Sequence, residues 1–244
     1  GGMFGTQTAA VLGGGFSPNT NPPGAGPPYV QTQQYNGSGW AVGGNLNNGR
    51  GDDAGIGTET AGLVAGGTSA PLNVKAEEYD GSTWTNGGDL TTGRRLAGGA
   101  SAGTQTAGLV WQGWPDSALT EEYNGASWSE VADLNTASAF SSGAGSQTAA
   151  LNMGGNNPTA PGVGSEEWNG ASWTAGNNMA NPRGIAAAFG GQTAAVVGGG
   201  ANPPTTYLTA VEKYDGTSFS ASPASLSSTR ALGGQAAGGS TAST

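Results

Sequence analysis

The chain of 244 residues contains no cysteine and no histidine. Their absence excludes disulfide bonds, thiol nucleophiles, the usual zinc sites and imidazole acid–base catalysis. Only seven residues are basic and the formal net charge is -9, so the clustered lysines and arginines of a nucleic-acid groove are lacking. No run of about 18 apolar residues is present, which excludes a membrane-spanning helix. We therefore expect no nucleic-acid partner, no membrane insertion, no metal and no cofactor.

Charge and large aliphatic side chains are also scarce. Charged residues make up 9% of the chain, and 48 glycines and 13 prolines make up a quarter of it. Taken alone, this composition is typical of disordered or low-complexity chains. The sequence begins at Gly1 without a signal-peptide pattern. We expect a processed product or a part of a longer chain.

What the chain does contain is a repeat, and a repeat outweighs composition. The stretch Glu77–Trp84, with the sequence EEYDGSTW, returns at 121–128 and 166–173, and looser copies occupy 33–40 and 212–219. The second aromatic residue of the five copies lies at positions 40, 84, 128, 173 and 219, which gives a period of 44 to 46 residues. A period of this length predicts a repeat architecture.

Each repeat contains the signals of four short strands. The dipeptide Asn-Gly or Asp-Gly inside the aromatic stretch predicts a tight hairpin. Upstream lies a turn with the pattern Gly-Thr-Gln-Thr, as at 5–8 and 103–106, between two segments of small and β-branched residues. Four antiparallel strands per repeat predict an all-β fold, a five-bladed β-propeller. Residues 1–244 form one domain, with repeats at 1–49 plus 230–239, 50–93, 94–137, 138–182 and 183–229.

The order of strands within a blade follows from crowding at the axis. Innermost strands converge, so the segments rich in glycine and alanine should lie there, with the aromatic hairpins outside. The first repeat starts at the turn between its first and second strands, so we expect it to lack an inner strand. The segment Ala231–Gly239 supplies a spare one. We expect it to pair with the N-terminal blade and to close the ring, because an open ring would expose a sheet edge.

The pattern of paired glycines, then Tyr, then Trp resembles the kelch repeat, as in Gly66-Gly67, Tyr79 and Trp84. The resemblance covers nearly the whole chain and implies a propeller similar to the central domain of galactose oxidase, although the copper chemistry of that enzyme requires the histidines and cysteine that are absent here. The third repeat departs from the pattern at Gln112-Gly113. The amino-acid sequence of the repeats, with Gly-Thr-Gln-Thr-Ala-Ala and Glu-Glu-Tyr-Asn-Gly-Ala-Ser-Trp, also resembles kelch-like repeats in structural and tail-associated proteins of bacteriophages.

Strand direction sorts the connections into two faces. The loops between second and third strands share one face with the links between blades, and the longest of them, 16–29, holds five prolines. Long loops on a rigid scaffold often carry function, but this one is equally consistent with an inert lid. Arginines should mark the same face, four residues after each outer strand. They are Arg50, Arg94, Arg183 and Arg230, with Ser138 at the remaining position. Two alternatives stand: each arginine pairs with a carboxylate or carbonyls between blades, or the ring binds an anion or sugar acid.

Aromatic residues outside the repeating set are the second group of candidates. Trp111 and Trp114 lie in or beside the corresponding loop of the third repeat, near Asp116, and Tyr29 and Tyr207 lie in those of the first and fifth. Exposed flat rings near polar groups suit sugar rings. The alternative is that they cap the blades or fill the lid.

Paired acids, such as Glu77-Glu78, suggest acid–base chemistry at first sight. Neighbours in a strand point to opposite sides of the sheet, so the two carboxylates cannot converge. We expect one to find a partner between blades and the other to face solvent. Asp52-Asp53 is a weak signal for a cation, and the tripeptide Arg50-Gly51-Asp52 is a chance match to an integrin-type motif. No catalytic residue is predicted.

These observations predict a non-enzymatic structural or adhesive module of a virion or an extracellular assembly. Its loop-bearing face would contact other structural subunits or cell-surface glycans. The alternative is a lectin-like glycan-binding propeller. Hydrolase activity is disfavoured by the missing histidine, cysteine and convergent acid pair.

Overall fold

The computed structural model describes residues 1–16, 28–67, 74–157, 160–202 and 206–229. Every regular element in these ranges is a β-strand. The same ranges contain no helix of the length and hydropathy that a membrane crossing requires. Short runs of small, β-branched and aromatic residues, broken every few positions by glycine, explain the absence of helices.

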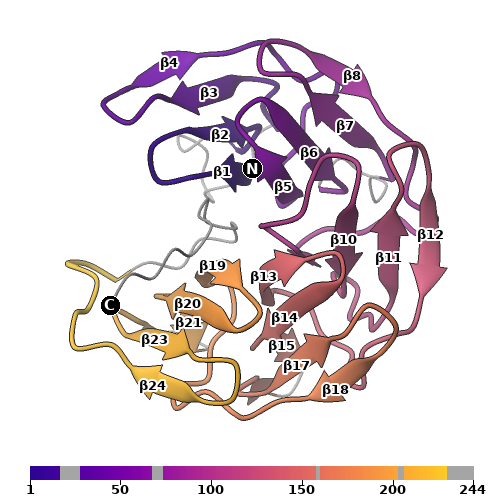
Figure 1. The fold of residues 1–244 in the computed structure, drawn as a ribbon. Coiled ribbons are helices and arrows are strands. Elements are labelled where there is room, and N and C mark those ends of the chain that lie inside the picture. Colours follow the sequence, from indigo (N-terminus) through magenta and orange to yellow (C-terminus); the bar gives the residue numbers. More distant parts are fainter. Residues whose placement is uncertain (17–27, 68–73, 158–159, 203–205, 230–244) are drawn as a thin grey trace.

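Twenty of the strands form five four-stranded antiparallel sheets arranged as the blades of a β-propeller (Figure 1). In each blade the strands follow one another in sequence order. The first two blades are β1 (Gly2–Gly5), β2 (Ala10–Gly13), β3 (Thr32–Tyr35) and β4 (Trp40–Val42), then β5 (Ala54–Thr58), β6 (Ala61–Ala65), β7 (Ala76–Tyr79) and β8 (Trp84–Asn86). The third is β9 (Gly98–Gly99), β10 (Gly108–Trp111), β11 (Thr120–Tyr123) and β12 (Trp128–Val131).

The last two blades each enclose an extra two-stranded hairpin in the loop between their second and third strands. The fourth blade is β13 (Ser142–Ser146), β14 (Ala149–Met153), β17 (Ser165–Trp168) and β18 (Trp173–Ala175), with the hairpin β15 (Asn156–Asn157) and β16 (Ala160–Pro161). The fifth is β19 (Ala187–Gly191), β20 (Ala194–Gly198), β23 (Val211–Tyr214) and β24 (Phe219–Ala221), with the hairpin β21 (Ala201–Asn202) and β22 (Thr206–Tyr207).

The prediction that small residues occupy the innermost strands is confirmed. The first strands of neighbouring blades lie side by side around the centre. A Cβ added to Gly143 of β13 would lie 2.2 Å from the carbonyl oxygen of Gly99 in β9, and one added to Gly55 of β5 would lie 2.6 Å from the nitrogen of Met3 in β1. No side chain fits where backbones approach this closely, so glycine sets the diameter of the ring.

The hydrophobic cores lie between the blades. The ring of Trp84 packs on Phe4 of the preceding blade at 6.0 Å, and that of Trp173 packs on Trp111 at 5.1 Å. The Trp84 indole also donates a hydrogen bond of 2.9 Å to Thr32 Oγ1. Burial of such a side chain stabilises the fold by about 2 to 3 kcal/mol. The aromatic residues of the repeat therefore join each blade to the one before it.

The first blade differs from expectation. β1 already occupies its inner position, and β1 pairs with β2 from Gly2 to Gly13, so the prediction that this repeat lacks an inner strand is wrong. Four residues with a glycine at each end gave no alternating signal to identify it. The predicted closing strand 231–239 lies outside the described residues.

The ends of the ring do not bury the residues that the other blades bury. Trp40 in β4 is 49% exposed, whereas its counterpart Trp84 in β8 is 5% exposed. Leu226, after the last outer strand, is likewise more exposed than its counterpart Leu90. Figure 1 shows the first and fifth blades facing one another across the remaining sector.

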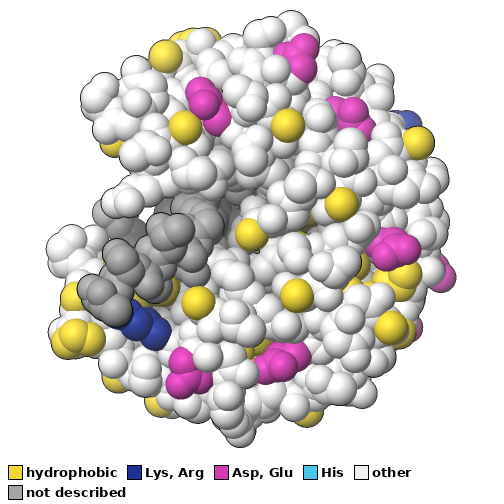
Figure 2. Space-filling model, viewed as in Figure 1, with side chains coloured by type: hydrophobic (Ala, Val, Ile, Leu, Met, Phe, Trp, Pro, Cys, Tyr) yellow, Lys and Arg dark blue, Asp and Glu magenta, His cyan; other side chains and the backbone are white. Residues whose placement is uncertain are grey.

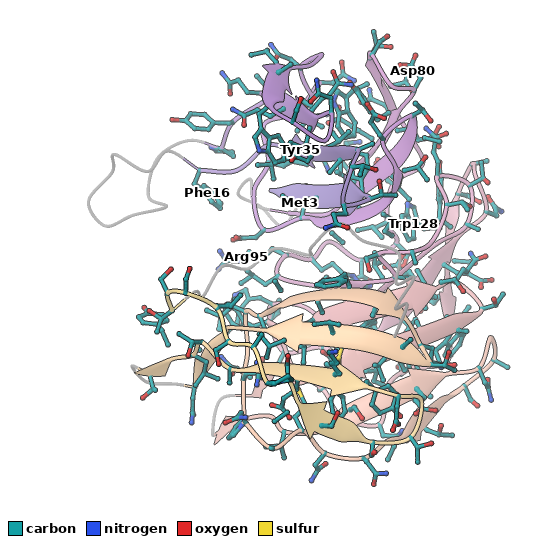
Figure 3. All side chains as sticks on the ribbon, turned by 60° about the vertical axis from the view of Figure 1, so that its left-hand side comes forward. Met3, Phe16, Tyr35, Asp80, Arg95 and Trp128 are labelled. Carbon is teal, nitrogen blue, oxygen red and sulfur yellow. The ribbon has the colours of Figure 1, made fainter. Side chains whose placement is uncertain are left out.

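The two faces of the ring are separated as predicted. We call the face with the hairpin tips the turn face, and the one with the second-to-third-strand loops and the links between blades the loop face. Figure 3 shows Asp80 on the turn face and Phe16 and Arg95 on the loop face. Asp80 makes its tight turn by accepting the backbone N–H groups of Ser82 and Thr83 at 2.8 and 2.7 Å.

Candidate functional site

Arginines join consecutive blades on the loop-face side. We call the contact between the first and second blades the first junction, and number the next three in order. Arg50 lies at the first junction, where its Nη1 donates to the carbonyl oxygens of Gly66 and Lys75 at 3.1 and 2.8 Å. Its Nη2 lies 2.7 Å from Glu77 Oε1. The carbonyl of Arg50 accepts the N–H of Gly15, so the residue is bonded to both blades.

The second and fourth junctions repeat this geometry. Arg94 Nη2 lies 2.5 Å from Glu121 Oε1, and Arg183 Nη2 lies 2.5 Å from Glu212 Oε1. Each glutamate also accepts backbone N–H groups of the link; for Glu212 these come from Ala180 and Asn181. Burial works to raise the pKa of Glu212, but hydrogen bonds from the Asn181 side chain and the Ala180 N–H, together with the Arg183 charge, outweigh it and lower the pKa.

The three guanidinium groups are therefore buried rather than presented at a channel mouth. The alternative in which each arginine pairs with a carboxylate and carbonyls between blades is confirmed for Arg50, Arg94 and Arg183. This geometry corrects the expectation of an arginine ring open to an external anion, because every Nη atom already has partners inside the junction. Arg230, the fourth member, lies outside the described residues.

The third junction keeps the glutamate but has Ser138 at the arginine position. Glu166 still accepts the N–H groups of Asn135 and Thr136 at 2.8 and 3.0 Å. A partly enclosed pocket of about 200 Å³ lies beside it. The lining includes Gln112, Ser138, Gly154, Gly164 and Glu166.

The candidate aromatic residues divide into one buried and three exposed side chains. Trp111 is fully buried, and its indole N–H donates to Asn152 Oδ1 at 2.9 Å. The prediction that Trp111 is exposed is wrong, because it is the last residue of β10 and not part of the loop. Tyr29, Trp114 and Tyr207 are 37%, 44% and 58% exposed. All three belong to second-to-third-strand connections, and hence to the loop face.

Trp114 has a cationic neighbour that the sequence pattern did not single out. The guanidinium carbon of Arg95 lies 6.0 Å from the centre of the Trp114 ring, and the backbone N–H of Trp114 donates to the Arg95 carbonyl at 2.8 Å. An arginine at this distance is attracted by the negative face of the ring. Asp116, on the same connection, is half-buried. Tyr29, Trp114 and Tyr207 belong to three different blades, the first, third and fifth.

The paired acids do not converge, as predicted, but the second acid is not simply solvated. Glu78 Oε1 accepts a hydrogen bond of 2.6 Å from the hydroxyl of Tyr123 in the next blade, and Glu167 accepts one from Tyr214. Burial and the bond to Glu78 raise the pKa of Tyr123 to about 12. The expectation that this acid faces solvent is therefore corrected for Glu78 and Glu167, which tie each blade to the following one.

The weak cation signal receives a structural explanation in part. Asp53 is buried and its Oδ2 accepts the N–H of Gly2 at 2.9 Å, joining the inner strands of the first two blades. Within the described ranges, no group of three or more acidic side chains could hold a metal ion. Figure 2 shows a surface of mostly uncharged groups with acidic side chains scattered singly and no gathering of Lys and Arg on the described part of this face.

The fold and the junctions define a five-bladed β-propeller. Comparison by sequence finds no matching protein family and no matching curated protein. Among solved structures, the chain is similar to the one described as "Structure of YjhT", with a TM-score of 0.71 and 12% identity over 88% of this chain and 80% of that one. At this identity the likeness shows the propeller fold alone.

Sequence reasoning missed that two departures from the repeat meet at one place. Gln112, where paired glycine is expected, and Ser138, where arginine is expected, both line the pocket at the third junction. The signal was available, since each departure falls at an aligned position of the repeat. An offset of 27 residues separates Arg50 from Glu77 and Arg94 from Glu121, and one of 29 separates Arg183 from Glu212; this near-constant spacing was a further signal for the ion pairs.

Proposed function

We propose that the chain is a non-enzymatic, kelch-like binding module that uses its loop face to attach to another macromolecule. The proposal rests on one observation: exposed aromatic rings project from the second-to-third-strand connections of three different blades, while most aromatic residues of the repeat are buried. Aromatic residues are enriched at binding surfaces, where they supply large contact area at low entropic cost. A rigid ring would hold these anchors at fixed separations.

The setting we propose is a virion or an extracellular assembly, and the partner is another structural subunit. The sparsely charged surface favours this setting, because charged residues are depleted at the centres of protein interfaces. The resemblance of the repeats to kelch-like proteins of bacteriophages supports the same direction. The second candidate is a lectin-like propeller, favoured specifically by Trp114 and its Arg95 neighbour, since a flat ring beside a hydrogen-bond donor suits a sugar.

The absence of cysteine in the chain makes the test clean. Thr206→Cys places a single thiol in the exposed β22 on the loop face, and Ala126→Cys places one at an exposed hairpin tip on the turn face. Each variant, carrying a photo-crosslinker, is returned to the native assembly. We expect crosslinks to a neighbouring subunit from Thr206→Cys and few from Ala126→Cys. Equal crosslinking from both faces, or none from either, would contradict the proposal.

The lectin alternative has its own test. A glycan array probed with the protein, with Trp114→Ala and with Trp40→Ala distinguishes a loop-face sugar site from general stickiness. Both substitutions remove a ring that is about half exposed, but only Trp114 lies on the loop face. Binding lost in Trp114→Ala and kept in Trp40→Ala favours the lectin, and no glycan binding by any variant leaves the structural role as the preferred one.

A further inference from the structure

The pocket at the third junction occupies the position that an arginine side chain fills at the other three junctions. At the second junction, Arg94 donates to the carbonyl oxygens of Gln112 and Leu119 at 3.3 and 2.8 Å and to Glu121. The aligned carbonyls at the third junction belong to Gly154 and Gly164, because the N–H of Gly154 donates to the Gly164 carbonyl as that of Gln112 does to Leu119. Both glycines line the pocket.

The carboxylate in the pocket has no cationic partner among the described residues. Glu166 is more than nine-tenths buried. Its counterparts Glu77, Glu121 and Glu212 each pair with a buried arginine. Within the described ranges, Glu166 accepts hydrogen bonds from Asn135 and Thr136 and from no cationic group. A buried carboxylate without a cation is costly, which favours a positively charged occupant.

Two further buried groups in the pocket are unsatisfied. Among the residues that the structure describes, Gln112 Oε1 and Ser138 Oγ have no hydrogen-bond partner, although both side chains are more than nine-tenths buried. The Gln112 amide nitrogen donates to the Thr136 carbonyl at 3.1 Å, which leaves its oxygen as a free acceptor. Buried polar groups in native proteins are normally paired, so these atoms indicate a site that receives donors from a ligand.

The shape of the pocket matches the chemistry of its lining. Its acceptors are two carbonyls, one carboxylate, one amide oxygen and one hydroxyl. A guanidinium group presents five donors in a plane and no acceptor. The volume of about 200 Å³ leaves room for an alkyl stem. Gly164 leaves open space at the edge of the pocket, because a Cβ at this residue would meet nothing within 4 Å. At the first junction the corresponding residue is Lys75, whose side chain forms an ion pair with Asp89.

We propose that the third junction is a binding site for an alkylguanidinium group that comes from outside the blade. Glu166 supplies the countercharge, the Gly154 and Gly164 carbonyls and Gln112 Oε1 accept the remaining N–H donors, and Ser138 leaves the space. The group belongs either to a small guanidinium compound or to an arginine side chain of a bound protein. This site is independent of the exposed aromatic rings that carry the proposed function.

The test is titration calorimetry of the purified protein with agmatine. We expect saturable binding, weakened by about tenfold or more in Glu166→Gln. Glu59→Gln, the same change in a turn of the second blade, is the matched control and should bind as the unmodified chain does. Ser138→Arg should abolish binding by filling the site.

The remaining arms separate the sources and the competing chemistries. An Ala-Ala-Arg-Ala-Ala peptide that binds more tightly than agmatine identifies a protein side chain as the ligand, and the reverse order identifies a small compound. Four results would overturn the proposal. Butylamine could bind as tightly as agmatine, or CaCl2 or MgCl2 could give binding heat where agmatine gives none. Agmatine could bind equally well to Glu166→Gln, or it could give no saturable heat at about 10 mM. Glu166→Gln keeps the test decisive if Ser138→Arg does not fold.

Discussion

The second and third junctions have the same backbone frame but different side chains within it. At both, the second residue of the paired-glycine position donates its N–H to the link carbonyl, Gly67 to Arg94 and Gly113 to Ser138. At both, a buried glutamate accepts two link N–H groups. Only the second adds a guanidinium. The comparison teaches that the glutamate and backbone bonds are sufficient to hold two blades together, and that the arginine neutralises and fills a site that already exists.

The largest expected difference between these junctions concerns the two glutamates. Glu121→Gln leaves Arg94 buried without its counterion, so we expect a loss of about 3 to 5 kcal/mol in the free energy of unfolding. Glu166→Gln removes charge-assisted hydrogen bonds but strands no cation, so we expect a loss of about 1 to 2 kcal/mol. Urea unfolding of both variants gives the comparison. Equal losses would show that Arg94 adds nothing to the second junction.

The next effect contrasts a complete junction with the end of the ring. Trp173 packs on Trp111 and donates to Thr120, so Trp173→Ala should cost about 3 kcal/mol. Trp40 is half exposed, and Trp40→Ala should cost about 1 kcal/mol or less. Thermal unfolding measures both. A loss at Trp40 as large as that at Trp173 would mean that the first and fifth blades pack together in solution like the others.

A smaller effect is expected from restoring the arginine. Ser138→Arg should stabilise the fold by about 1 kcal/mol, because Glu166 is already buried and gains charge-assisted hydrogen bonds. This corresponds to a rise in Tm of about 2 to 4 °C. Ser138→Lys is the control and should give less, since an ammonium lacks the planar fork that reaches carbonyls and carboxylate together. A fall in Tm for the arginine variant alone would show that the pocket does not accept a guanidinium.

The smallest effect is expected at the turn face and depends on pH. The N–H groups of Thr83 and Ser82 lower the pKa of Asp80 from 3.8 to about 2. A folded-state pKa below the unfolded value means that this stabilisation is present above about pH 4 and is lost as the pH falls through about 2. Asp80→Asn, the residue found at Asn124 and Asn169 in other blades, should therefore gain stability relative to the unmodified chain on acidification. A constant difference in Tm between pH 6 and pH 2.5 would contradict this assignment.

The sequence predicts the ring well because its strongest signals are local and repeated. The hairpin at Asp80-Gly81 needs only a positive φ, which Gly81 adopts, and five such turns at one period specify five blades. The inner strand β1 is not predicted from the sequence, because Gly2 and Gly5 conceal the alternating pattern of a strand. The sequence pattern predicts a loop position for Trp111 because Gln112 replaces the glycine that marks the strand end in the other repeats.

The site is less predictable because it depends on where side chains turn. The position of each arginine in the chain is clear, but whether Arg94 points to solvent or into a junction depends on Glu121, which lies 27 residues later. A pocket is harder still to predict, because the sequence shows which residues are present but not which spaces they leave unfilled. The pocket beside Glu166 exists because Ser138 and Gly164 are small. Only the packing of the third blade against the fourth shows that these two small residues line the same pocket.

The glycines at the centre also limit how this protein could have evolved by duplication. The second, third and fifth repeats begin with an arginine that pairs with a glutamate of the same repeat, so copying one of them in the gene would insert a unit able to bond to its neighbours. A sixth unit would nevertheless widen the central opening, and backbones that now touch, such as Gly143 and Gly99, would separate with no side chains to fill the space. The close backbone contacts at these glycines therefore favour a ring of five units over a larger one.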